Sequence, residues 1–112
     1  MKPRPTARLT NGPPALVRTG LGFDIHPFAA GRRLVLGGVQ FRQRLGLAGH
    51  SDADVLCHAV ADALLGAVAD GDIGRHFPDT DPRYAGISSA RLLETVLAEI
   101  TRRGFEIENV DV

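Results

Sequence analysis

The stretch at residues 49–66, GHSDADVLCHAVADALLG, constrains the fold of this chain more than any other. At about 100° per residue, Asp54, His58 and Asp62 fall on one narrow helical stripe. Apolar residues occupy the opposite arc, namely Leu56, Val60, Ala63, Leu64 and Ala67. The stretch contains neither Lys nor Arg. This pattern predicts an amphipathic helix whose polar stripe faces a ligand or a neighbour instead of solvent.

The start of this helix admits two interpretations. Ser51 or His50 occupies the expected N-cap position, and Asp52 and Asp54 in the first turn suit the positive end of the helix dipole. Ser51 and His50 could bind a phosphate together with the backbone N–H groups, or Ser51 could simply cap the helix. A serine nucleophile activated by His50 is disfavoured, because no third group is placed to orient the histidine.

A first strand is predicted over residues 15–23, with Pro27 ending its regular pairing. It delivers Asp24 and His26, which are two residues apart and therefore lie on the same face of an extended chain. Together with His58 they offer two imidazoles and a carboxylate, the ligand set of a catalytic zinc site. Asp54 and Asp62 could orient the His58 ring or lie beside the site without being ligands. The alternative is that His26 is a strand-end histidine bonded to the backbone and that His58 is a half-buried core residue.

The remaining pattern predicts an α+β domain. A strand or hairpin over residues 33–41 is broken by the Gly-Gly pair, and residues 45–49 form a connecting loop. A long loop covers residues 75–86, and a helix runs from residue 89 to about 103 with Ser88 as its cap and Gly104 after its end. Residues 105–112 alternate as a strand. Cys57 is interpreted as a small core residue.

Several polar residues of the loops have two possible roles. Asp72, Asp79 and Asp81 could hold hydroxyl groups or a divalent cation. Asp79 and Asp81 could equally be turn residues beside prolines. His76 is interpreted as a loop histidine and not as a ligand.

Length and composition restrict the class of protein. A chain of 112 residues forms one domain, and residues 1–14, with four of the seven prolines, are expected to be a flexible tail. Thirteen basic and thirteen acidic residues argue against nucleic acid as the partner. One cysteine excludes an internal disulfide and fits a reducing compartment, and no apolar run reaches the roughly 18 residues of a membrane span. We therefore expect a cytoplasmic protein.

Seven blocks of this sequence resemble the 2-C-methyl-D-erythritol 2,4-cyclodiphosphate synthase family. They are residues 22–28 (GFDIHPF), 36–39 (LGGV), 49–58 (GHSDADVLCH), 62–66 (DALLG), 71–74 (GDIG), 76–82 (HFPDTDP) and 109–112 (NVDV). The resemblance implies an α+β fold, a two-layer sandwich of a mixed β-sheet with helices on one face. It also implies a homotrimer whose active sites lie between neighbouring subunits.

The activity implied is part of non-mevalonate isoprenoid biosynthesis. The enzyme cyclises 4-diphosphocytidyl-2-C-methyl-D-erythritol 2-phosphate and releases CMP, with the substrate supplying the nucleophile. The resemblance implies zinc on Asp24, His26 and His58, and magnesium or manganese as a second divalent cation. His50 is implied as the catalytic group that stabilises the transition state. The implied substrate-binding residues are Asp24, Ile25, His26, His50, Ser51, Asp72, Ile73, Gly74, Phe77, Pro78, Asp79, Thr80 and Asp81.

Members of that family continue beyond a strand equivalent to residues 105–112. They carry a cytidine-binding segment there, and a Thr-Thr-Glu segment that contributes to catalysis. We therefore expect residues 15–112 to be a synthase-like domain without its C-terminal part. The rival hypothesis is a catalytically inactive fragment that binds zinc and phosphate.

Overall fold

The computed structural model describes residues 16–112, so the tail expected at residues 1–14 lies outside the described part. The elements it describes confirm the α+β class. In chain order they are β1 (Phe28–Ala30), β2 (Leu34–Leu36), β3 (Val39–Phe41), β4 (Leu45–Leu47), α1 (Val55–Ala67), α2 (Ile73–His76), the 3-10 helix η1 (Pro82–Tyr84) and α3 (Ser89–Arg102). Within residues 16–112, no helix combines the length and the apolar character needed to span a membrane.

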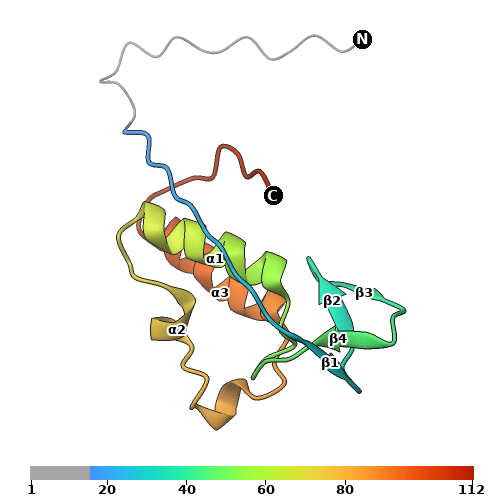
Figure 1. Cartoon of the computed structure of the whole chain (residues 1–112). Coiled ribbons are helices and arrows are strands. Elements are labelled where there is room, and N and C mark those ends of the chain that lie inside the picture. The colour runs from blue at the N-terminus through green and yellow to red at the C-terminus, as the bar shows by residue number, and fades with distance from the viewer. Residues whose placement is uncertain (1–15) are drawn as a thin grey trace, which may run out of the picture.

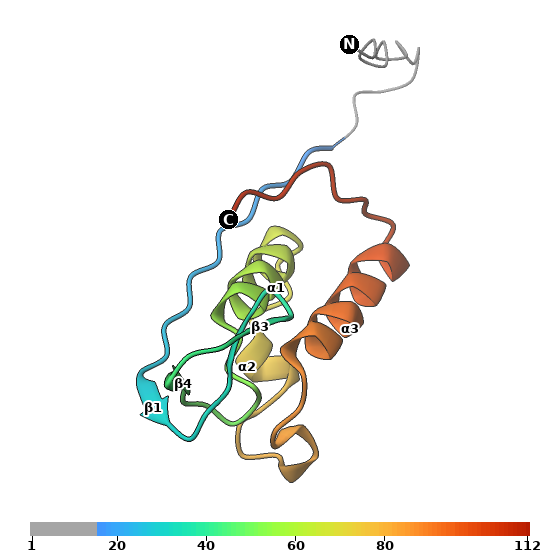
Figure 2. The same cartoon turned by 90° about the vertical axis from the view of Figure 1, so that its right-hand side faces the viewer.

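Helices α1 and α3 lie side by side and form the core (Figures 1 and 2). Val96 and Ile100 of α3, one turn apart, pack against Ala61 and Leu65 of α1. The predicted second helix is confirmed, with Ser88 at its N-cap and Gly104 in the left-handed conformation after its end. The Ser88 side chain, however, makes no capping hydrogen bond.

Helix α1 begins later than the sequence predicts. Its N-cap is Asp54, whose side chain accepts the Cys57 N–H, so the expected cap at Ser51 or His50 is wrong. Ala53 explains the difference, because this fully buried residue has a φ of 57° and a left-handed residue interrupts a right-handed helix. The loop at residues 49–53 therefore approaches the helix without being part of it.

Two short antiparallel sheets lie beside the helices (Figure 1). Strands β2 and β3 form the predicted hairpin, and Gly37 and Gly38 at its turn have φ values of 60° and 77°. Strand β4 pairs with β1, so the prediction of a plain loop at residues 45–49 is wrong. Strand β1 also begins directly after Pro27, where the sequence predicted that pairing would end.

The strands predicted at residues 15–23 and 105–112 do not form a ladder among residues 16–112, so the two antiparallel pairs stand in place of the expected mixed sheet. Residues 16–27 instead run as an extended segment along α1 (Figure 1). A Cβ at Gly20 or Gly22 would overlap backbone carbonyl groups of α1. The extended segment is therefore aligned with a helix, which offers no row of free backbone groups for strand pairing.

Candidate metal centre

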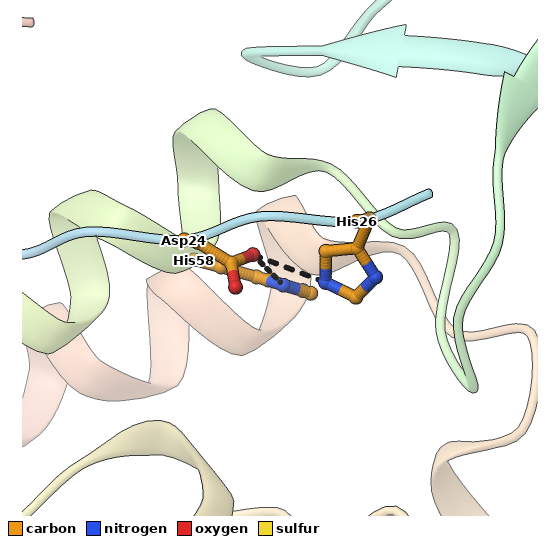
Figure 3. Close-up of side chains that lie close together, drawn as sticks. All are labelled: Asp24, His26 and His58. Atoms are coloured by element: carbon orange, nitrogen blue, oxygen red, sulfur yellow. Dashed lines mark hydrogen bonds and ion pairs between the residues drawn. The ribbon is translucent and has the colours of Figure 1, made fainter. Parts of the chain in front are cut away.

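The extended segment and α1 bring three potential ligands together (Figure 3). Gly22, Asp24 and His26 face α1, as the two-residue spacing predicts. Asp24 Oδ2 lies 3.1 Å from His26 Nε2 and 3.0 Å from His58 Nδ1. One potential ligand atom from each of the three residues lies within 4.8 Å of the other two. This triad (Asp24, His26 and His58) is the only group of three or more His, Cys, Asp or Glu residues in the described chain with this geometry.

Backbone contacts hold the His26 ring. Its Nδ1 lies 2.6 Å from the carbonyl oxygen of Ala48. Because a carbonyl only accepts, Nδ1 carries a proton, and Nε2, which faces Asp24, is the nitrogen whose lone pair a metal ion would take. Gly49 lies against the same ring, and a Cβ there would crowd its Cε1 and Nδ1 atoms. The backbone bond of a strand-end histidine is therefore present, and it leaves a ligand nitrogen available.

The His58 ring is buried between two serines. Its Nε2 lies 2.8 Å from Ser89 Oγ and 3.2 Å from Ser51 Oγ. Ser89, at the start of α3, is 1% exposed. Ser89 is not recognisable from the sequence, because its only local signal is the Ser-Ser pair, in which Ser88 is the expected cap. Ser89 reaches His58 only through the packing of α3 on α1.

The residues of the triad fit a metal ion. A tetrahedral zinc with bond lengths of about 2.0 Å separates its ligand atoms by about 3.3 Å. The two distances from Asp24 Oδ2 are close to this value, so little movement of the side chains is required. Two imidazoles and one carboxylate also form a donor set that zinc accepts in sites with an open position.

Asp54, the N-cap of α1, and Asp62 within α1 have other hydrogen-bond partners, so neither orients the His58 ring. Asp54 is fully buried and accepts backbone N–H groups of Gly37, Gly38 and Cys57. Burial favours a raised pKa, but these hydrogen bonds outweigh it and the pKa of Asp54 lies below its ordinary value. Asp62 Oδ1 accepts the Ile73 N–H at 2.8 Å and thereby joins α2 to α1.

The loop at residues 50–52 is bonded to the segment that precedes α3. His50 Nε2 lies 2.8 Å from the Asp81 carbonyl oxygen, and the His50 carbonyl accepts the Gly86 N–H at 2.7 Å. Ser51 is buried, and its Oγ accepts the Ala53 N–H. His50 and Ser51 are therefore held on the same side of the molecule as the triad, since Ser51 also contacts His58.

The other predicted substrate residues are spread over two segments. Asp72 and Asp81 are the N-caps of α2 and η1, so both have a capping role in the structure. The Arg83 guanidinium, 2.6 Å from Asp81, lowers the pKa of the Asp81 carboxyl group. Ile25 is 77% exposed, on the opposite face of the extended segment from Asp24. The remaining positions lie in or near α2: Ile73 and Phe77 are half-buried, and Gly74, Pro78, Asp79 and Thr80 are exposed.

Cys57 and His76 lie outside the triad. Cys57 is buried, and burial together with Asp54 raises the pKa of its thiol to about 12, so it is a core residue as predicted. His76 ends α2, a short helix in the region predicted as a loop, and its Nε2 lies 2.8 Å from the Asp70 carbonyl oxygen.

Comparison with known proteins adds an independent result. The chain is 61% identical over 95 residues to a 2-C-methyl-D-erythritol 2,4-cyclodiphosphate synthase of Agathobacter rectalis, an alignment that covers 85% of this chain and 54% of the relative. A solved synthase structure superposes with a TM-score of 0.72 at 45% identity, covering 78% of this chain and 58% of the other. A second one, described as the CDP-bound form, gives 0.71 at 44% identity with the same coverage.

The chain thus spans about half of the length of its relative from A. rectalis. The solved structures support the α+β fold, and the sequence identity confirms the resemblance drawn from the seven motif blocks. A family model described as the YgbB family matches residues 17–112, a range that contains all three residues of the triad. This chain belongs to the YgbB family.

Proposed function

We propose that this chain carries the zinc-binding part of a cyclodiphosphate synthase of the non-mevalonate isoprenoid pathway. The reaction converts 4-diphosphocytidyl-2-C-methyl-D-erythritol 2-phosphate to 2-C-methyl-D-erythritol 2,4-cyclodiphosphate with release of CMP. The observation that carries the proposal is the triad, beside Ser51, in a chain 61% identical to a relative with that name. A homotrimer in the cytoplasm, with residues 15–112 as its synthase-like domain, belongs to the same proposal.

Asp24, His26 and His58 would hold the zinc ion. When bound, zinc would supply positive charge next to the diphosphate of the substrate, and magnesium or manganese would be the second cation. The 2-phosphate of the substrate is itself the nucleophile. The protein would therefore position the substrate and stabilise the negative charge that develops on it.

His50 and Ser51 would bind phosphate oxygens. The Asp81 carbonyl accepts the Nε2–H of His50, so Nδ1 is the nitrogen that remains for the substrate. A protonated Nδ1 would donate to an oxygen on which negative charge develops, which makes His50 the proposed catalytic group. The bond to Asp81 also fixes the orientation of the ring before the substrate binds.

Two segments would line the methylerythritol end of the substrate, residues 72–74 and residues 77–81. Asp62 and the three capping bonds at Asp54, Asp72 and Asp81 hold these segments and their neighbours in place. Asp72 keeps one carboxylate oxygen that does not accept the capping bond, and this oxygen is the proposed acceptor for a substrate hydroxyl group. Both carboxylate oxygens of Asp81 accept from Arg83, so Asp81 would have to exchange part of this ion pair for a substrate hydroxyl group.

A second candidate is a fragment that binds zinc and phosphate without turnover. The specific observation in its favour is that the triad lies beside Ser51 and that the His50 ring is held by the Asp81 carbonyl, which brings together groups able to bind zinc and phosphate.

One experiment separates the two candidates. The purified chain is incubated with zinc, magnesium and the authentic substrate; CMP is measured by chromatography, and zinc per chain by atomic emission. Turnover that is lost in His50→Ala, with zinc retained, supports the synthase. One zinc per chain without CMP supports the binding fragment. Loss of zinc in His58→Ala but not in the matched variant His76→Ala tests the ligand assignment, and unchanged zinc in His58→Ala overturns it.

A further inference from the structure

The Nε2 atom of His58, on the side of the ring away from Asp24, contacts a short series of hydrogen-bonded polar side chains. His58 Nε2 lies 2.8 Å from Ser89 Oγ, and Ser89 Oγ lies 2.5 Å from Asp52 Oδ1. Ser89 is 1% exposed and His58 8% exposed, so water does not compete freely for these bonds. Three segments of the chain meet here: the loop before α1 contributes Asp52, α1 contributes His58, and the start of α3 contributes Ser89.

The direction of the hydrogen bonds follows from the chemistry of the groups. The Asp52 carboxylate only accepts, so the single hydroxyl hydrogen of Ser89 is donated to Asp52. Ser89 Oγ is then an acceptor towards His58, which requires the proton of the neutral imidazole on Nε2. This tautomer leaves the lone pair that a metal ion would take on Nδ1, the nitrogen that faces Asp24. Without a metal, the Asp24 carboxylate also only accepts, so it favours a proton on Nδ1 and opposes the effect of Ser89.

We propose that Ser89, supported by Asp52, is a positioning residue that selects the metal-binding tautomer of His58 and fixes its ring. The inference rests on the proposed metal centre and adds a role for α3, which contributes no ligand to it. Outer partners of this kind orient metal-bound histidines and raise their basicity, and removing one costs about 10- to 100-fold in metal affinity.

Ser51 is the weaker of the two serine partners. Its Oγ lies 3.2 Å from His58 Nε2, and it also accepts the Ala53 N–H at 3.2 Å. His26 differs again, because its Nδ1–H is held by a backbone carbonyl that no side-chain substitution removes. Ser89 is therefore the position at which the tautomer of one ligand can be tested by mutation.

The test compares Ser89→Ala with Ser88→Ala, an exposed neighbour whose side chain makes no capping bond. Zinc affinity of the 112-residue chain is measured by competition with a chromophoric chelator. We expect Ser89→Ala to bind zinc about 10- to 100-fold more weakly and Ser88→Ala to bind it as the parent does. An affinity of folded Ser89→Ala within twofold of the parent overturns the inference.

A second measurement needs no metal. The ¹⁵N chemical shifts of the His58 ring in metal-free Asp24→Ala, where no carboxylate faces Nδ1, should show the proton on Nε2, and this preference should weaken when Ser89→Ala is added. A proton on Nδ1 in Asp24→Ala overturns the inference. If Ser89→Ala does not fold, Asp52→Asn replaces it, with an expected loss of zinc affinity smaller than tenfold but measurable, and an affinity equal to that of the parent overturns the inference. Absence of zinc binding in the parent would refute the metal centre, while these shifts would still decide the role of Ser89.

Discussion

His58 lies on α1, where buried polar bonds connect it to α3, whereas Asp24 and His26 lie on the extended segment of residues 16–27. On the α1 side, Asp54, His58 and Ser89 are all buried and hydrogen-bonded. The extended segment presents Leu21 to solvent at 92% exposure and touches α1 through glycines. The triad thus joins two regions. The densely bonded region contains Asp54, His58 and Ser89, and the extended segment is held to α1 mainly by the close approach of backbone atoms.

This difference indicates how the metal site is assembled. The α1 side provides one ligand that is already oriented, and the extended segment provides two ligands whose position depends on how closely the segment lies on the helix. A metal ion would connect the two regions directly. The following changes break or sharpen this contrast, and they are ordered from the largest expected effect to the smallest.

Removal of the Asp54 side chain should disrupt the densely bonded region most. In Asp54→Ala, three backbone N–H groups that are now bonded to the carboxylate would lose their acceptor. We expect the free energy of unfolding in urea to fall by about 4 kcal/mol. Asp72→Ala is the matched control, because it removes an exposed cap at a cost of about 1 kcal/mol. Equal losses in the two variants would contradict this account.

The same carboxylate predicts a dependence of stability on pH. Because the pKa of Asp54 is lower in the folded chain than in the unfolded chain, its contribution is fully present above about pH 4. It is lost as the pH falls through the folded-state pKa. Unfolding measured at pH 7 and at pH 3 should therefore show a smaller acid destabilisation in Asp54→Ala than in the parent.

Gly22→Ala should separate the extended segment from α1. The new Cβ would overlap the Ala59 carbonyl oxygen, so the segment must move away and carry Asp24 and His26 with it. We expect zinc affinity to fall about 100-fold, which corresponds to about 2.7 kcal/mol. Zinc titration against a chelator provides the measurement, and an unchanged affinity would show that the close approach is dispensable.

Zinc itself should stabilise the extended segment more than residues 105–112, which contribute no ligand to the triad. At a free concentration of about 100 times the Kd, the folded chain gains about 2.7 kcal/mol. Hydrogen exchange followed by mass spectrometry should show slower exchange at residues 22–27, with a smaller change at residues 105–112. Equal protection of both segments would argue against a metal-dependent link between the two regions.

Gly66→Ala should have the smallest effect on the free energy of unfolding, and it should stabilise the chain where the substitutions above destabilise it. Gly66 lies in α1, is exposed, and has no atom from outside its own helix turn within 4 Å of the position that a Cβ would take. We expect the free energy of unfolding to rise by about 0.5–1 kcal/mol, because alanine favours helix more than glycine does. Zinc affinity should not change, so a loss of affinity would contradict the assignment of tight contacts to Gly20 and Gly22.

Helices were the most predictable part of this chain, because their apolar residues recur at helical spacing over several turns. The first residue of α1 was not predictable, since Ser51, Asp52 and Asp54 are all favourable N-cap residues. The left-handed Ala53 decides between them, and alanine gives no sequence signal for that conformation.

Contacts between distant segments account for the other differences. Residues 105–112 alternate as a strand does, but alternation does not show whether a partner strand lies alongside. Strand β4 was missed because Gly46 reads as a loop residue, although it lies so close to the Arg32 and Arg33 carbonyls that a Cβ would not fit. The triad followed from spacing and resemblance, while Ser89 depends on how α3 packs on α1.

Cys57 makes the densely bonded region observable in a simple way. It is the single cysteine of the chain, it lies one residue before His58, and its thiol is both buried and raised in pKa to about 12. Alkylating reagents react with thiolates, so labelling of the folded chain near neutral pH should be very slow. The labelling rate then reports how often α1 opens. The same cysteine can therefore be used to compare the opening of α1 in every variant described above.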